Sequence, residues 1–81
     1  MGMLRVLSRH GDDRFTWNNT QVEVGDPEAI AAIREAEQIF KEQRESGATA
    51  VRMAPGRPAE RIDQFDPEAE QIVMIPRVVG G

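Results

Sequence analysis

Two glycines, Gly80 and Gly81, end the sequence directly after the apolar pair Val78 and Val79. Because glycine lacks a Cβ atom, such an end is thin enough to enter a narrow tunnel and present a carboxylate to a nucleotide. Glycines also favour frayed chain ends, which is the simpler interpretation. The segment before the diglycine leads us to prefer the first of these two interpretations, in which the carboxylate of Gly81 is activated.

The sequence of that segment is typical of a strand followed by an extended tail. Residues Gln71–Ile75 have the β-branched composition and the length of a buried strand. Pro76 cannot donate a hydrogen bond to a neighbouring strand, so the strand should end there. We therefore predict a folded domain over residues 1–76 and an extended, flexible tail over residues 77–81, clear of the fold.

A second group of residues could do chemistry near the N-terminus, where His10 precedes Asp12 and Asp13. These residues could form a metal site or an acid/base cluster. Adjacent Gly and Asp residues are more typical of a solvated turn, because Gly adopts positive φ and Asp bonds its own backbone. We therefore predict a turn over residues 10–13, with no metal site and no catalytic residue.

Composition narrows the function classes. The 81 residues form one domain with a small core, and they include one His, no Cys and no Tyr. Without a glycine-rich phosphate loop as well, the chain has little from which to build an active site, so we do not expect an enzyme. Its net charge of −4, with both signs dispersed, argues against binding nucleic acid.

Other features indicate a cytoplasmic protein. No apolar stretch reaches membrane-spanning length, and the segment Met1–Arg5 does not resemble the apolar core of a signal peptide. The basic residues are nine arginines and one lysine, Lys41. Apart from the N-terminus, Lys41 is therefore the one amine of the chain that could accept an acyl group.

The first part of the chain predicts a hairpin. Residues 3–8 have strand character, and Arg14–Trp17 alternates polar and large aromatic residues. Phe15 and Trp17 should lie on one buried face, so we expect Trp17 to pack in the fold rather than serve as a ligand platform.

The asparagines that follow interrupt this pattern. Asn18–Thr20 is polar, and Gln21–Val24 then alternates as a strand does. The second strand should therefore either bulge at Asn18 and Asn19 or break there.

A long helix is predicted over residues 27–45. Asp26 can cap it and Pro27 suits the first helical position. Gly47 is the expected left-handed residue after its C-terminal end. One apolar stripe at helical spacing should pack on the sheet: Ala29, Ile30, Ile33, Ala36 and Phe40.

The remaining residues predict a second group of strands. Residues 48–53 have strand character, residues 55–58 form an irregular loop, and residues 59–65 form either a short helical turn or a packed connector. Several apolar residues could make an exposed patch or core, with core expected for at least one set: Val51, Met53, Ala54, Ile72 and Met74. A mixed four-to-five-stranded sheet packed on one long helix is a two-layer α+β domain.

This order of elements, with a last strand leading into Gly80 and Gly81, resembles the β-grasp fold of ubiquitin and of the bacterial sulfur carriers, including the thiamine branch. The tail is similar to that of the small subunit of molybdopterin synthase, Pro-Pro-Val-small-Gly-Gly. It matches that pattern at Pro76, Val78, Gly80 and Gly81. Arg77 replaces the second proline, and a basic residue there is similar to the tail of ubiquitin.

The resemblance implies that a separate activating enzyme, which holds ATP and magnesium, adenylates the carboxylate of Gly81. This chain would be the substrate and carrier and would bind no cofactor itself. Arg77, Val78 and Val79 would be the residues through which the partner recognises the tail. The acyl group would pass either to an amine, with Lys41 a possible acceptor, or to sulfur as a thiocarboxylate.

Further partners implied by the resemblance are a conjugation target, a deconjugating protease or a synthase subunit, and the chain alone is expected to be a monomer. The alternative is an interaction or assembly module of similar fold. In that case the diglycine is incidental, and partners bind through the exposed side of the sheet.

Overall fold

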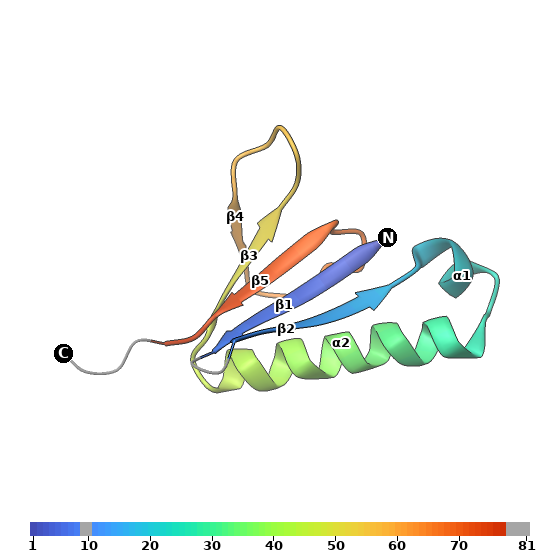
Figure 1. The fold of residues 1–81 in the computed structure, drawn as a ribbon, viewed down its shortest axis with the longest axis horizontal. Coiled ribbons are helices and arrows are strands. Elements are labelled where there is room, and N and C mark those ends of the chain that lie inside the picture. The colour runs from blue at the N-terminus through green and yellow to red at the C-terminus, as the bar shows by residue number, and fades with distance from the viewer. Residues whose placement is uncertain (9–10, 78–81) are drawn as a thin grey trace.

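The computed structural model describes residues 1–8 and 11–77. Within them, a five-stranded sheet packs on one long helix, which makes the two-layer α+β domain that the sequence predicted (Figure 1). The elements are β1 (Gly2–Ser8), β2 (Gly11–Trp17), α1 (Asn19–Glu23), α2 (Pro27–Glu45), β3 (Thr49–Met53), β4 (Glu60–Ile62) and β5 (Gln71–Ile75).

The sheet is mixed, with the order β2-β1-β5-β3-β4. β1 runs antiparallel to β2 and parallel to β5, whereas β3 runs antiparallel to both β5 and β4. The last strand of the sequence therefore lies in the middle of the sheet, paired on both sides.

The predicted hairpin is confirmed, but the turn over residues 10–13 is wrong. β2 begins at Gly11, so Asp12 and Asp13 belong to the strand, where Asp12 faces Leu7 of β1. Ion pairs between Asp12 and two arginines offset the poor strand propensity of aspartate. His10 lies outside the described residues.

Trp17 packs in the core, as predicted, with 2% of its surface exposed. Its ring centroid lies 5.2 Å from that of Phe65, which in turn lies 5.8 Å from the ring of Phe40 on α2. Phe15 is partly buried on the same face. These aromatic side chains join β2, α2 and the segment before β5.

The strand predicted over Gln21–Val24 is wrong, because α1 occupies residues 19–23. The second strand breaks at Asn18, one of the two expected outcomes, and the Asn18 side chain accepts a hydrogen bond from the backbone N–H of Gln21. An asparagine cap and a glycine after the helix were the sequence signals for it.

α2 has the predicted bounds. Its N-terminal cap is Asp26, whose side chain accepts a hydrogen bond from the N–H of Glu28 at 3.0 Å. Ala36 and Phe40 of the predicted stripe are buried, and Ile33 packs against them. The helix covers the sheet face that carries the largest fully buried side chains of the described residues: Leu4, Trp17, Ile72 and Met74.

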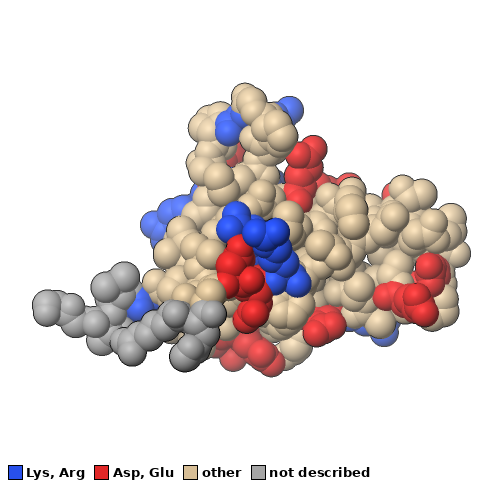
Figure 2. Space-filling model, viewed as in Figure 1, with Lys and Arg blue, Asp and Glu red and all other residues tan. Residues whose placement is uncertain are grey.

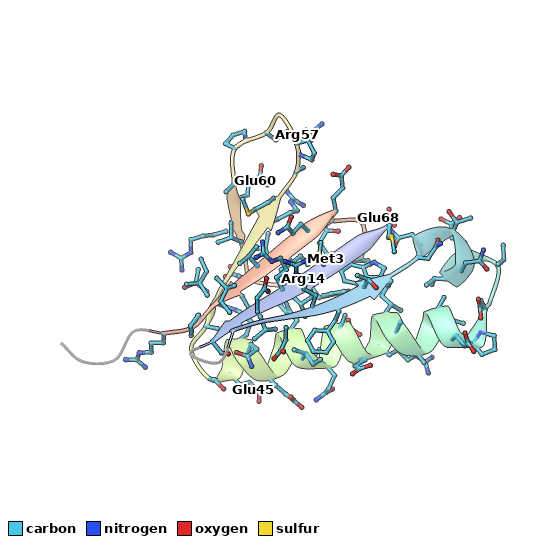
Figure 3. All side chains as sticks on the ribbon, in the orientation of Figure 1. Met3, Arg14, Glu45, Arg57, Glu60 and Glu68 are labelled. Carbon is cyan, nitrogen blue, oxygen red and sulfur yellow. The ribbon has the colours of Figure 1, made fainter. Side chains whose placement is uncertain are left out.

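Residues 59–65 form no helical turn. Three of them form the edge strand β4, which was not predicted, while Ile62 and Phe65 pack against the core, as expected of a packed connector. The β3–β4 hairpin projects from the body, with Arg57 near its tip (Figures 1 and 3). Arg52 of β3 ties this arm to the body, since its guanidinium donates to Asp66 at 2.6 Å and also pairs with Glu60.

The two faces of the sheet differ in cover. Ile72 and Met74 lie under the helix, which confirms core for that set, whereas Val51 and Met53 lie on the opposite face. That open face also carries Ile75, and the exposed fractions of Ile75 and Met53 are 42% and 43%.

Candidate functional site

The candidate site is the end of β5, because the diglycine follows it in the sequence. β5 pairs with β1 as far as Met74 and with β3 as far as Ile75, which faces Thr49. Pro76 and Arg77 follow, both exposed. The predicted tail residues Val78, Val79, Gly80 and Gly81 lie outside the described residues.

Arg77 lies against the turn between α2 and β3. A Cβ atom at Gly47 would be 3.1 Å from the Cδ atom of Arg77, 3.6 Å from its Cβ and 3.9 Å from its Cγ. The aliphatic part of the Arg77 side chain therefore rests on the bare backbone of Gly47. Figure 1 shows why these residues meet: β5 and α2 end at the same end of the molecule.

Gly47 also closes the helix, as predicted. Its φ is +94°, and its N–H donates to the carbonyl oxygen of Arg44 at 3.0 Å. The N–H of Ala48 donates to the carbonyl of Gln43 at 3.0 Å, which completes a Schellman motif. A residue with a side chain would thus meet both a strained φ and the Arg77 stem.

Lys41, the possible acceptor, is exposed on α2. It lines a hollow of about 470 Å³ between the helix and the segment before β5, beside Phe40 and Phe65. Arg44 and Asp63, which form an ion pair at 3.3 Å, also line this hollow. Lys41 is therefore accessible to a reagent from solvent.

A charged group lies on the open face of the sheet, where Figure 2 shows blue and red side chains together near the centre and Figure 3 labels Arg14 close to Met3. Asp12 accepts from Arg5 Nη2 at 2.7 Å and from Arg14 Nε at 3.2 Å. The hydrogen bonds from Arg5, above all, lower the pKa of Asp12, and Asp12 in turn raises the pKa of Arg5. Since Asp12 is already paired, this group is a structural clasp rather than an acid/base pair.

A second hollow, of about 440 Å³, lies between the projecting arm and the segment before β5. Arg52 and Arg57 line it on the arm, and Asp66, Glu68 and Glu70 line it on the body. Hydrogen bonds to Asp66 first, and then to Glu60, raise the pKa of Arg52. The hollow is therefore lined by side chains of both signs, with Arg52 already committed to Asp66.

Metal binding finds no support in the part of the chain that the structure covers, where no three His, Asp or Glu side chains are grouped to hold an ion. Neither helix described, α1 or α2, has the length and apolar character needed to cross a membrane.

Sequence reasoning located the end of β5 but missed the contact between Arg77 and Gly47, which are 30 positions apart. No periodicity links two such residues, and topology alone brings them together. The ion pairs of Asp12 were missed for another reason: the residue was assigned to a turn.

Comparison of the chain with models of protein families, with curated proteins and with solved structures found no match.

Proposed function

We propose that this chain is a β-grasp protein of the ubiquitin-like type whose C-terminal carboxylate, on Gly81, is adenylated by a separate enzyme. The observation that carries the proposal is the place of β5. It lies in the middle of the sheet, paired parallel to β1, and leads through Pro76 toward the diglycine.

The arrangement of the other elements supports the same fold. A long helix connects the β1–β2 hairpin to β3 and covers one face, and a short edge strand completes the order β2-β1-β5-β3-β4. This arrangement is similar to the β-grasp fold. A fold by itself does not establish a function, so the proposal also rests on the residues at the chain end.

The chemistry begins with the carboxylate oxygen of Gly81, which attacks the α-phosphorus of ATP. The bond from that phosphorus to the bridging oxygen breaks, pyrophosphate leaves with the bonding pair, and an acyl adenylate forms. The carbonyl carbon is then open to a nucleophile, and AMP is the leaving group. ATP and magnesium belong to the partner enzyme, and this chain supplies the acyl group.

We propose two alternative reactions for the acyl adenylate. An amine on a target protein gives an amide conjugate, with Lys41 as an acceptor within the chain. A partner persulfide gives an acyl disulfide, from which a second thiol releases a thiocarboxylate on Gly81 and is itself left in a disulfide.

Trapping the adenylate tests the proposal. The untagged protein is incubated with an extract of its native host, ATP and hydroxylamine, whose nitrogen displaces AMP to leave a hydroxamate on the terminal residue. We expect ATP-dependent hydroxamate on Gly81 and none after deletion of Gly81, with an unchanged circular dichroism spectrum. An extension added after Gly81 should block hydroxamate formation as well. An extension of the same length at the N-terminus is its matched control. Hydroxamate that survives the deletion would contradict the proposal.

The second candidate function is an interaction module that binds through the open face of the sheet. The observation that favours it is the exposure of Ile75 and Met53 on a face that no described helix covers. Exposed apolar side chains grouped on one face often mark an interaction surface. A partner that binds the wild-type protein and the Gly81 deletion equally would favour this candidate.

A further inference from the structure

We propose that Gly47 positions the activated tail, because its missing side chain provides the seat on which the stem of Arg77 rests. This inference rests on the proposed function, and it assigns a role in activation to a residue outside the tail. The seat would hold Arg77, the root of the tail, at one place relative to the folded domain. The partner enzyme would then meet the tail and the domain in a fixed arrangement.

The contact is close enough to depend on glycine. Three carbons of the Arg77 stem lie within 3.9 Å of the place where a Cβ atom at Gly47 would stand, and the nearest is 3.1 Å away. That distance is shorter than an ordinary carbon–carbon contact, so the stem would have to shift by a few tenths of an ångström to admit a methyl group there. The seat itself is rigid, because Schellman hydrogen bonds from Gly47 and Ala48 hold it.

The charged end of Arg77 remains available. Among the described residues, Arg77 has no hydrogen bond or ion pair, and its side chain is exposed. The stem is thus held while the guanidinium stays free to meet an acidic side chain of the partner. Its place beside the C-terminal end of α2 is also favourable, because that end of a helix carries partial negative charge.

Gly25 offers a matched control. It closes α1 with the same motif, since its N–H donates to the carbonyl of Val22 and that of Asp26 donates to Gln21. Its φ is +83°, close to that of Gly47, but a Cβ atom there would have no atom within 4 Å. Gly25→Ala therefore reproduces the backbone strain of Gly47→Ala without touching the tail root.

The experiment joins a structural and a kinetic measurement. Nuclear Overhauser effects between the α-protons of residue 47 and the δ-protons of Arg77 report the seat. The rate of hydroxamate formation in a fixed amount of host extract, measured against the concentration of this protein, gives KM and the maximal rate. Ordering one long side chain costs about 0.5–1.5 kcal/mol, so loss of the seat should raise KM about two- to tenfold.

We expect Gly47→Ala to weaken the nuclear Overhauser effect to Arg77 and to raise KM at an unchanged maximal rate, whereas Gly25→Ala leaves the effect and KM as in the wild type. A chain made by synthesis with D-alanine at position 47 tolerates the positive φ and points its methyl group elsewhere, so its KM should return to the wild-type value. In an Arg77→Ala background, Gly47→Ala should raise KM no further.

The outcomes separate the two proposals. A wild-type protein that forms hydroxamate but shows no contact between residue 47 and Arg77 would overturn the seat alone. Equal KM values for Gly47→Ala and Gly25→Ala, or additive effects of the Gly47 and Arg77 variants, would do the same. If the wild type forms no hydroxamate, the proposed function fails, and the positioning role fails with it.

Discussion

The indole Nε1 of Trp17 donates a hydrogen bond to the backbone oxygen of Pro67 at 3.0 Å, across 50 positions of sequence. The Asn19 side chain donates to the same oxygen at 2.9 Å. The turn that leads into β5 is thus fixed to the end of β2 and the start of α1. This contact holds the segment before β5 in place, and β5 itself pairs with β1 and β3 from Gln71 onward.

Replacing Trp17 should therefore lower the free energy of unfolding by more than the loss of its buried apolar area alone would. We predict that Trp17→Phe lowers the free energy of unfolding by about 1–3 kcal/mol, because it leaves a cavity and removes one donor to Pro67. Urea unfolding followed by far-UV circular dichroism measures this. Thr16→Ala, at the exposed neighbouring position, is the control and should change stability by no more than about 0.5 kcal/mol. Equal effects of the two variants would show that Trp17 is not a core residue.

Gly2 is a second test of the same packing. A Cβ atom at Gly2 would overlap the Cε2 atom of Trp17, so Gly2→Ala should destabilise the fold by about 1–3 kcal/mol. A Cβ atom at Gly2 would also meet Cζ2, which belongs to the benzo ring of the indole, and the smaller ring of phenylalanine does not extend to it. In the Trp17→Phe background, Gly2→Ala should therefore cost less, and a double-mutant cycle by urea unfolding measures the coupling. Strictly additive costs would rule out this contact.

Asp12 should make stability depend on pH in the acid range. Its pKa is lowered in the fold, chiefly by hydrogen bonds from Arg5, so the unfolded chain takes up its proton first as the pH falls. The stabilisation is present above the ordinary aspartate pKa of about 3.9 and is lost as the pH falls through the lowered folded value. We predict that Asp12→Asn is less stable than the wild type at pH 7, with a gap that narrows as the pH falls below about 3.9.

Urea unfolding at a series of pH values checks this, with Asp13→Asn as the matched control. Asp13 lies next to Asp12 on the same strand but takes part in none of the ion pairs among the described residues. If the difference in unfolding free energy between Asp12→Asn and the wild type stays constant from pH 7 to low pH, the ion pairs contribute nothing to stability.

The open face of the sheet distinguishes the two candidate functions. Ile75→Ser replaces a 42%-exposed side chain at the end of β5 and should change stability by no more than about 1 kcal/mol. If the chain acts through its carboxylate alone, the variant should form hydroxamate at the wild-type rate. A loss of partner binding with unchanged hydroxamate formation would instead favour the interaction module.

Much of the fold could be predicted because local signals carried it. Asp26, Pro27 and Gly47 mark the ends of α2, and the β-branched run before Pro76 marks β5. β4 was missed because it is three residues long and carries charge at Glu60 and Arg61, as edge strands often do. A short, charged strand has almost no periodicity to detect.

α1 was missed although its caps were visible in the sequence. The alternation of Gln21–Val24 was given more weight than Asn18 and Gly25, the residues that end the helix. The candidate site was predicted from Gly80 and Gly81 together with the strand-like run and Pro76 before them. Its setting against Gly47 depends on a parallel pairing of β1 and β5 that joins the two ends of the chain, which no local pattern specifies.

The most direct test of the account is the intact mass of the untagged protein, isolated from its native host and again after incubation with host extract and ATP. We predict that, with ATP, the protein gains either the mass of one sulfur exchanged for one oxygen or the mass of a target joined through an amide. The Gly81 deletion should gain neither. A wild-type mass that stays unchanged under both conditions would contradict the account.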